Sequence, residues 1–203
     1  MDGFEMNFIE QVYLNNKNYK GIIFVDRDGT INDDVNYLSD KSQIIIFPKV
    51  IEGIKLLNKY KIAVVVITNQ PVVARGLLSI DELREINDLL VKKINAGGAF
   101  IEAIYSCPHH PENNHADIPA FAMKYRIDCD CRKPGTAMLK RAISIFGIKD
   151  KFGMIGDHER DVETAKNFGI RSALIQSKIN INLKKNQPDF ICANFLDAVK
   201  ELL

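Results

Sequence analysis

Two aspartates, Asp26 and Asp28, stand two residues apart directly after the apolar run 21–25. Two carboxylates in such a place can divide a reaction between them. One attacks as a nucleophile, and the other exchanges a proton with the leaving oxygen. Asp-x-Asp is also common in turns, because aspartate side chains accept hydrogen bonds from the nearby backbone. Taken alone, the pair therefore fits a reactive site and an ordinary turn equally well.

Three of the four cysteines fall within a window of 25 residues, beside two histidines. The pattern C-x-H…C-x-C offers three thiolates and one imidazole, a common ligand set for structural zinc. Its members are Cys107, His109, Cys129 and Cys131. The segment has little regular pattern, and so long a loop needs something to order it. We predict a zinc-stapled loop over 107–131. The alternative is that the cysteines are buried apolar residues and the histidines lie on the surface.

Two further imidazoles, His110 and His115, lie close to this pattern. We rank both below His109, because C-x-H mirrors C-x-C. The remaining cysteine, Cys192, lies in the C-terminal apolar run and is interpreted as a core residue.

Short apolar runs alternate with longer amphipathic segments along the chain, which predicts an α/β fold with a mainly parallel sheet. We expect a Rossmann-like three-layer sandwich. The predicted strands are 21–25, 62–67, 100–105, 152–155 and 172–175, and the predicted helices are 49–60, 79–94, 136–146 and 159–168. Ser79 and Glu82 form a capping box at the start of the second helix. Residues 190–203 predict a last short strand and a closing helix.

Polar residues stand where the predicted strands end. Asp26, Thr68, Cys107 and the pair Gly156-Asp157 each follow a different strand. In an open parallel sheet the carboxyl ends of the strands meet at one edge, where ligands bind. We therefore expect these four positions to line a single crevice.

The motifs in this order resemble those of the haloacid dehalogenase-like phosphatases. The first motif is 25–30 followed by Ile31-Asn32, the second is Thr68, the third is Lys133, and the fourth is Gly156-Asp157 with Asp161. Together they extend over residues 21–176. The resemblance implies that Asp26 forms an aspartyl-phosphate and that Asp28 is the general acid and base. It also implies that Thr68 and Lys133 contact the phosphoryl oxygens.

The same resemblance implies a magnesium site. Its ligands would be the Asp26 carboxylate, the Asp28 backbone carbonyl and Asp157, with Asp161 supporting Lys133 or the hydrated metal. Magnesium prefers carboxylate oxygens and retained waters, which suits such a set. A domain that has lost catalysis and only binds a partner is the non-enzyme alternative. It is disfavoured because Asp26, Asp28, Lys133 and Asp157 are all present.

Four segments are similar to the D-glycero-D-manno-heptose 1,7-bisphosphate 7-phosphatases. They are Asp-Arg-Asp-Gly-Thr-Ile-Asn at 26–32, Thr-Asn-Gln-x-x-x-Ala-Arg-Gly at 68–76, Cys-Pro-His-His-Pro at 107–111 and Cys-x-Cys-Arg-Lys-Pro at 129–134. This likeness implies a substrate site lined by Asp34, Val35, Asn36, Tyr37, Asn69, Gln70, Pro71, Arg132 and His158. Arg132 would recognise the second phosphate. The histidinol-phosphate phosphatases share the motifs and the zinc staple, but the longer loop between His109 and Cys129 favours the sugar bisphosphate.

The chain departs from this pattern at two places near the substrate. Pro71-Val72-Val73 replaces the commoner Ser-Gly-Ile, and His158 replaces a common lysine. These changes bear on the substrate, and they leave the phosphoryl-transfer residues unchanged. About 20 residues separate Thr30 from the next predicted helix, which is too short for a large cap domain.

The balance of charged residues disfavours some classes of binding partner. The formal net charge is +1, from 27 basic and 26 acidic residues, which gives no general attraction for nucleic acid or a membrane surface. The first ten residues do not look like a signal peptide, so we expect a cytoplasmic protein whose partner is a small phosphorylated metabolite. We divide the chain into an extension of unknown role at 1–19 and a phosphatase domain at 20–203. The oligomeric state is left open, with a slight preference for a monomer.

Overall fold

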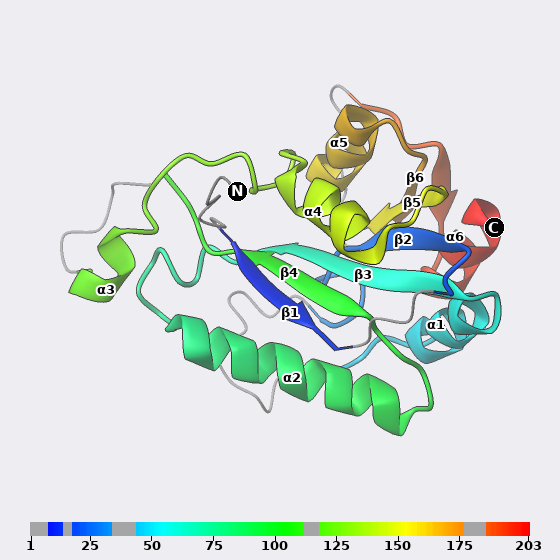
Figure 1. Ribbon diagram of the computed structural model, residues 1–203, viewed down its shortest axis with the longest axis horizontal. Coiled ribbons are helices and arrows are strands. Elements are labelled where there is room, and N and C mark those ends of the chain that lie inside the picture. The colour runs from blue at the N-terminus through cyan, green and yellow to red at the C-terminus, as the bar shows by residue number, and fades with distance from the viewer. Residues whose placement is uncertain (1–7, 14–17, 34–43, 112–117, 177–185) are drawn as a thin grey trace.

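The computed structural model describes residues 8–13, 18–33, 44–111, 118–176 and 186–203. Its centre is a seven-stranded sheet in the order β1-β4-β3-β2-β5-β6-β7, with helices on both faces (Figure 1). The strands are β1 Ile9–Val12, β2 Gly21–Val25, β3 Ile62–Asn69, β4 Ala103–Cys107, β5 Lys151–Gly156, β6 Ser172–Ile175 and β7 Phe190–Cys192. The helices are α1 Val50–Lys59, α2 Ile80–Ala96, α3 Ala120–Met123, α4 Ala137–Phe146, α5 Glu159–Phe168 and α6 Phe195–Leu202. The predicted α/β fold is confirmed.

The central strands are buried on both faces because their apolar runs are continuous. All five residues of β2 are buried, and β3 is buried up to Thr68. These two strands pair in parallel from Gly21 opposite Ile62 to Val25 opposite Val66. Continuous runs of β-branched residues are typical of parallel strands covered by helices on both sides.

Alternate residues of β2 point into two separate cores. Ile23 and Val25 pack into the core formed with α1, α2 and α6. Ile22 and Phe24 pack into the core formed with α4 and α5. Because successive side chains of a strand point to opposite faces, one five-residue run holds both helix layers in place. Figure 1 shows α1 and α2 on one side of the sheet and α4 and α5 on the other.

The predicted elements agree closely with the observed ones, and the capping box is present. Ser79 Oγ accepts from Glu82 N at 3.2 Å, and Ser79 N donates to Glu82 Oε2 at 2.7 Å. The predicted start of the third strand at 100 is wrong, since β4 begins at Ala103. The reason is local: the backbone N–H and carbonyl of Phe100 pair with the side chain of Asn58, at 2.8 and 3.0 Å.

Residues near the N-terminus, which the sequence left without a role, form an edge strand. β1 pairs antiparallel with β4, from Ile9 opposite Ser106 to Val12 opposite Ala103. The remaining neighbouring strands of the sheet are paired in parallel. The short helix α3, within the 107–131 loop, was also not predicted from the sequence.

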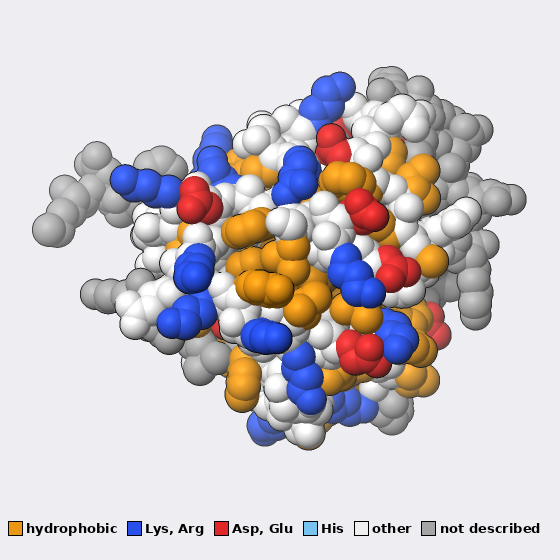
Figure 2. Space-filling model, turned by 90° about the vertical axis from the view of Figure 1, so that its right-hand side faces the viewer, with side chains coloured by type: hydrophobic (Ala, Val, Ile, Leu, Met, Phe, Trp, Pro, Cys, Tyr) orange, Lys and Arg blue, Asp and Glu red, His pale blue; other side chains and the backbone are white. Residues whose placement is uncertain are grey.

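The described part of the chain holds no cap domain beside the sheet, and within it no helix combines the length and the apolar character of a membrane span. Figure 2 shows the side of the molecule where α6 and the C-terminus lie in Figure 1. Hydrophobic side chains gather near the centre of this face, and lysine and arginine side chains surround them together with some acidic ones.

Candidate active site and metal clusters

Three buried aspartates come together at the carboxyl edge of the sheet. Asp26 follows β2, Asp157 follows β5, and Asp161 lies in the first turn of α5. Their carboxylate oxygens lie within 4.8 Å of one another, and the three residues are 2–8% exposed. Parallel strands end at the same edge of the sheet, so the acids that follow β2 and β5 and the acid in the first turn of α5 meet at one point.

A single buried lysine joins this acid cluster. Lys133 Nζ lies 2.7 Å from Asp26 Oδ1 and 2.6 Å from Asp161 Oδ1. The backbone at Lys133 is held by Asn69, whose Oδ1 accepts from Lys133 N at 2.9 Å and whose Nδ2 donates to Lys133 O at 3.1 Å. One ammonium group faces three carboxylates, so the cluster carries unbalanced negative charge when all three are ionised.

The excess of negative charge contributes to raised pKa values for two of the three aspartates. Burial and the charge of Asp161 raise the pKa of Asp26 to about 6. Burial, and then the charge of Asp26, raise the pKa of Asp157 to about 8. Burial and like charge both disfavour the ionised carboxylate, whereas a nearby cation restores it. Magnesium prefers oxygen ligands with carboxylates among them, so this donor set fits a Mg²⁺ ion.

Two glycines give these carboxylates room. A Cβ on Gly29 would lie 2.1 Å from Asp157 Oδ2, and Gly29 has a φ of +79°. A Cβ on Gly156 would lie 2.4 Å from Asp161 Oδ2. Because any side chain at either position would overlap an acid, the two glycines are part of the geometry of the cluster.

Asp28 is turned away from the acid cluster toward amide and guanidinium groups. Arg27 donates to both of its oxygens, from Nε at 3.0 Å and from Nη2 at 2.9 Å. Asn32 Nδ2 and Gln70 Nε2 donate to it at 3.0 and 2.7 Å. Burial acts to raise the pKa of Asp28, but the Arg27 charge and these hydrogen bonds lower it.

The remaining predicted positions lie around these two groups. Thr68 is buried, and its Oγ1 accepts from Gln70 Nε2 at 2.8 Å. Gln70 therefore bridges Thr68 and Asp28. Pro71 is half-buried in the turn after β3. Residues Asp34, Val35, Asn36 and Tyr37, predicted to line the substrate site, lie outside the described residues.

Two predicted substrate residues are sequence neighbours of site residues: Arg132 directly precedes Lys133, and His158 directly follows Asp157. Arg132 is half-buried, and its Nη1 donates to the carbonyl of His109 at 3.2 Å. His158 is exposed and forms the N-cap of α5, where its backbone N–H donates to Asp161 Oδ2 at 3.1 Å. The cap thus orients the same aspartate that pairs with Lys133.

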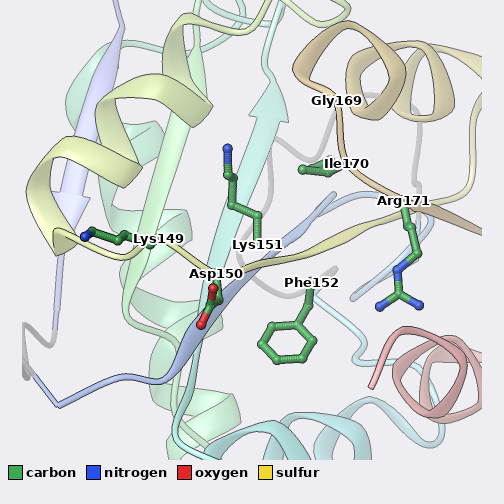
Figure 3. Close-up of a pocket in the computed structure, with 7 residues that line it drawn as sticks. All are labelled: Lys149, Asp150, Lys151, Phe152, Gly169, Ile170 and Arg171. Atoms are coloured by element: carbon green, nitrogen blue, oxygen red, sulfur yellow. The ribbon is translucent and has the colours of Figure 1, made fainter.

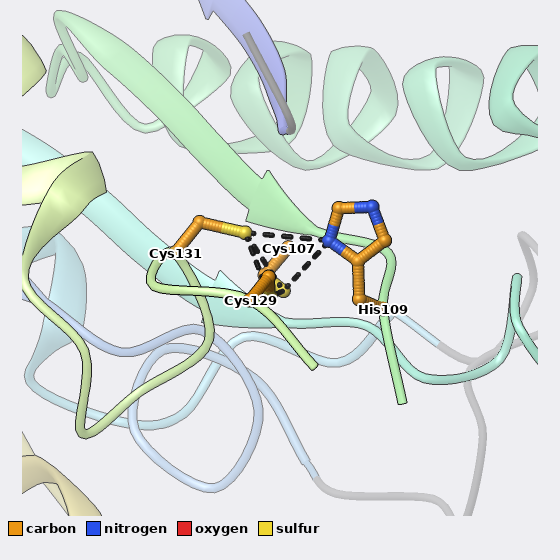
Figure 4. A group of neighbouring side chains, drawn as sticks. All are labelled: Cys107, His109, Cys129 and Cys131. Carbon is orange, nitrogen blue, oxygen red and sulfur yellow. Dashed lines mark hydrogen bonds between the residues drawn. The ribbon is translucent and has the colours of Figure 1, made fainter. Parts of the chain in front are cut away.

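A second group of ligating side chains lies where β4 ends. Figure 4 shows three sulfurs and one ring nitrogen pointing to a common centre, from Cys107, His109, Cys129 and Cys131. The three S···S separations are 3.2–3.6 Å, and His109 Nδ1 lies 3.4 and 3.7 Å from two of the sulfurs. Zinc–sulfur bonds of about 2.3 Å in a tetrahedron give edges of roughly 3.7 Å, so the group is compatible with a zinc site.

The other thiol and imidazoles behave differently. His110 is outside this group, and its backbone N–H donates to the carbonyl of Tyr125 at 3.1 Å. His115 lies outside the described residues. Cys192 is buried in the core formed with α1, α2 and α6, which confirms its interpretation as a core residue.

Comparisons with known proteins agree with this geometry. A family model described as HAD-hydrolase-like (haloacid dehalogenase-like) matches residues 130–198. The D-glycero-beta-D-manno-heptose-1,7-bisphosphate 7-phosphatase of Pasteurella multocida is 32% identical over 184 residues, which cover 89% of this chain and 96% of that protein. The chain belongs to the haloacid dehalogenase-like phosphatases.

Two further matches also cover most of this phosphatase and most of the other protein. The protein of the same name from Rhodopseudomonas palustris is 35% identical over 148 residues, which cover 72% of this chain and 78% of that one. The crystal structure of a D,D-heptose 1,7-bisphosphate phosphatase from B. bronchiseptica, complexed with magnesium and phosphate, matches with a TM-score of 0.71 and 25% identity. That match covers 90% of this chain and 97% of the other.

One surface hollow of the phosphatase is separate from the candidate site. It measures about 310 Å³ and is lined by Lys149, Asp150, Lys151, Phe152, Gly169, Ile170 and Arg171 (Figure 3). Lys151 is the first residue of β5, whereas Asp157 follows the end of that strand. The hollow therefore opens at the amino end of β5, away from the acid cluster.

Sequence reasoning missed several residues that support the site in this phosphatase. Arg27, treated only as the middle residue of Asp-x-Asp, is fully buried and grips Asp28. Asn32, whose Nδ2 donates to Asp28 Oδ1, belongs to the first motif, but the sequence does not predict this contact. The available signal was the presence of a basic residue inside a buried strand end, where an arginine needs an acidic partner.

Proposed function

We propose that this chain is a Mg²⁺-dependent phosphomonoesterase that removes the 7-phosphate of D-glycero-D-manno-heptose 1,7-bisphosphate through an aspartyl-phosphate intermediate. One observation carries the proposal: the Asp26 carboxylate lies at the rim of the sheet, 2.7 Å from Lys133 Nζ and within 4.8 Å of Asp157. A nucleophile, a fixed positive charge and a further acid are thus assembled at one point. The names of the relatives support the substrate.

The reaction has two halves. In the first, a carboxylate oxygen of Asp26 bonds to phosphorus while the bond from phosphorus to the sugar oxygen breaks. The electron pair leaves with that oxygen, which takes a proton from the Asp28 carboxyl group. In the second half, the Asp28 carboxylate takes a proton from water, and the water oxygen displaces Asp26 from phosphorus. General acid–base help of this kind contributes about 10²–10⁴-fold.

Positive charge and hydrogen-bond donors must face the phosphoryl oxygens during both halves. Lys133 supplies an ammonium group already placed beside the nucleophile. Thr68 supplies a buried hydroxyl at the end of β3. Asp161 accepts from Lys133 at 2.6 Å and so aims it toward the site.

A magnesium ion would be held by the Asp26 carboxylate, the Asp28 backbone carbonyl and Asp157. It would supply positive charge that lets an anionic nucleophile approach an anionic phosphate. The zinc ion would be structural, held by Cys107, His109, Cys129 and Cys131. Four protein ligands leave no open position, which is the pattern of structural zinc.

The second phosphate is assigned to Arg132. Arg132 is tied to the zinc-binding segment through the carbonyl of His109. The charges of Arg160 and Arg75 lie close enough to contribute to its lowered pKa, for which burial is the largest cause. This positive charge acting at Arg132 favours a substrate with a second anionic group, because arginine binds phosphate with two parallel hydrogen bonds.

Phosphate release with purified protein tests the proposal. Heptose 1,7-bisphosphate as both anomers, the corresponding 1-phosphate and histidinol phosphate are compared with and without Mg²⁺. We expect the bisphosphate to have the highest kcat/KM, to lose one phosphate per molecule, and to require Mg²⁺. A preference for histidinol phosphate would overturn the substrate assignment. The absence of turnover with every phosphate monoester would favour the non-catalytic binding domain instead.

A further inference from the structure

A buried chain of hydrogen bonds connects the N-terminal edge strand with Asp28. Gln11 on β1 accepts from Asn87 Nδ2 at 2.9 Å through its Oε1. Asn87 Oδ1 accepts from Arg27 Nη1 at 2.9 Å. Arg27 then donates to Asp28 from Nε and Nη2. The four residues come from three distant parts of the sequence and form one continuous path.

The two middle residues of this path are fully enclosed. Arg27 and Asn87 are both 0% exposed. Asn87 is fixed at both ends of its amide, because Nδ2 also donates to Ser106 Oγ at 3.2 Å. A buried side chain with all its polar atoms paired has few alternative positions. Asn87 therefore restricts where the Arg27 guanidinium can lie.

The geometry of the guanidinium passes this restriction on to Asp28. A guanidinium is planar, and its donors form a rigid fork that matches both oxygens of a carboxylate. Fixing the plane of Arg27 fixes the plane of the carboxylate it grips. A lysine in its place would supply a point charge without this directional control.

We propose that Arg27 is a positioning residue for the general acid Asp28, and that Asn87 and Gln11 determine the orientation of Arg27. The N-terminal strand β1 is then part of the support for catalysis. This inference rests on the proposed function, in which Asp28 gives a proton to the leaving oxygen as the phosphorus–oxygen bond breaks. It goes beyond that function in assigning a role to three residues, Arg27, Asn87 and Gln11, that the proposed reaction steps do not use.

Leaving groups of different basicity separate positioning of the acid from general damage. A sugar alkoxide needs a proton to leave, whereas p-nitrophenolate leaves readily without one. Misplacing Asp28 should therefore lower kcat/KM, which reports the half in which the leaving group departs, much more for a sugar phosphate than for p-nitrophenyl phosphate. The later attack of water, in which Asp28 acts as base, is common to both substrates and does not enter kcat/KM. A loss of folded protein would slow both substrates by the same factor.

Three variants interrupt the path at successive points. In Arg27→Lys we expect kcat/KM for the sugar phosphate to fall by about 30-fold, a part of the roughly 10²–10⁴-fold that general acid–base catalysis supplies. Asn87→Asp keeps an acceptor for Arg27 but competes with Asp28 for the guanidinium, and we expect about a 10-fold fall. Gln11→Leu, on the half-buried edge strand, should give about a 3-fold fall. In each variant kcat/KM for p-nitrophenyl phosphate should stay within about 2-fold.

Tyr13→Phe is the matched control. Tyr13 also connects β1 with α2, through a 2.8 Å hydrogen bond from its hydroxyl to Asp88 Oδ1. Asp88 accepts from Gln11 Nε2 as well, at 2.9 Å, but is not a member of the path from Gln11 through Asn87 and Arg27 to Asp28. Losing the tyrosine hydroxyl weakens the same contact between elements and leaves the path to Asp28 intact. We expect no selective effect on either substrate.

Asp28→Asn calibrates the measurement and keeps two failures apart. It should show the largest selective loss with the sugar phosphate. If it shows no selectivity, the acid role in the proposed function is wrong. If it is selective while Arg27→Lys, Asn87→Asp and Gln11→Leu lose both substrates equally, or lose neither, the positioning inference is overturned and the proposed function stands.

Discussion

The acid cluster and the thiol–imidazole cluster are both buried groups of side chains a few ångströms apart, but they are built differently. The acids lie at the ends of β2 and β5 and in the first turn of α5, and they share the ammonium group of Lys133. The thiols lie at the end of β4 and in the loop that follows, and they contact one another and His109. Hard oxygen ligands beside a nucleophile suit an exchangeable cation, whereas a closed set of soft ligands suits a permanent one. The comparison therefore distinguishes a cluster suited to the reaction from a cluster suited to stabilising the fold.

The largest effect should come from Asp26, the proposed nucleophile of the acid cluster. We expect Asp26→Asn to lower kcat by at least about 10⁴-fold, as removal of a covalent nucleophile does in other hydrolases. The melting temperature should change little, because Lys133 keeps its partner Asp161. Phosphate release and thermal unfolding measure the two effects. Activity near that of the natural chain would exclude the covalent mechanism.

The thiol–imidazole cluster should respond in stability before activity. We expect Cys131→Ser to remove bound zinc and to lower the free energy of unfolding by about 3–5 kcal/mol, in the range of the largest single-residue effects. Metal analysis and denaturant unfolding provide the measurements. Cys192→Ser is the control, since it removes a buried thiol outside the cluster. If the two variants bound equal amounts of zinc, the thiol–imidazole cluster would not be the zinc site.

A buried acid far from both clusters sharpens the comparison. Glu102 accepts from Val64 N at 2.6 Å, and burial raises the pKa of its carboxyl group to about 7. The folded-state pKa lies above the ordinary glutamate value of 4.5, so the stability contributed by this group is fully present below pH 4.5 and is lost as the pH rises through 7. The natural chain should therefore lose on the order of 3 kcal/mol between pH 5 and 8, and Glu102→Gln should lose less. Denaturant unfolding across this range measures how the free energy of unfolding changes with pH, and Glu52→Gln, at an exposed position of α1, is the control. Equal pH dependence in Glu102→Gln and the natural chain would contradict the assignment.

The smallest effect concerns the space left by Gly29. In Gly29→Ala the new Cβ meets Asp157 at 2.1 Å and the φ of +79° is strained, so we expect a loss of about 2 kcal/mol together with reduced activity. Gly147→Ala carries a similar φ of +62° with nothing within 4 Å of the new Cβ, and should cost about 1 kcal/mol with full activity. Denaturant unfolding and phosphate release compare the two. Equal activity in both variants would show that Gly29 serves the backbone alone.

Local patterns were enough to predict much of the fold. The apolar runs at β2 and β3 and the capping box of α2 depend on neighbouring residues, so the sequence shows them directly. The order of the strand ends also predicted that Asp26 and Asp157 would meet. The acid cluster follows from these local patterns together with the general geometry of parallel sheets.

What the sequence did not reveal depends on contacts between distant residues. Arg27 and Asn87 are 60 positions apart, and nothing in either local pattern indicates that they pair. The direction of the Asp28 carboxylate depends on the same contact. β1 is four residues long and becomes recognisable only beside β4. Short edge strands have too few residues for their periodicity to be distinctive.

The position of β1 has a consequence for how copies of the chain behave toward one another. β1 occupies the outer edge of β4, and β4 belongs to the buried centre of the sheet. A shortened chain that begins at residue 20 would leave the backbone N–H and carbonyl groups of β4 unpaired along that edge. Exposed edges of this kind recruit strands from other molecules. In the structure the edge of the sheet is instead formed by β1, which is four residues long, and very short edge strands offer other chains little to pair with.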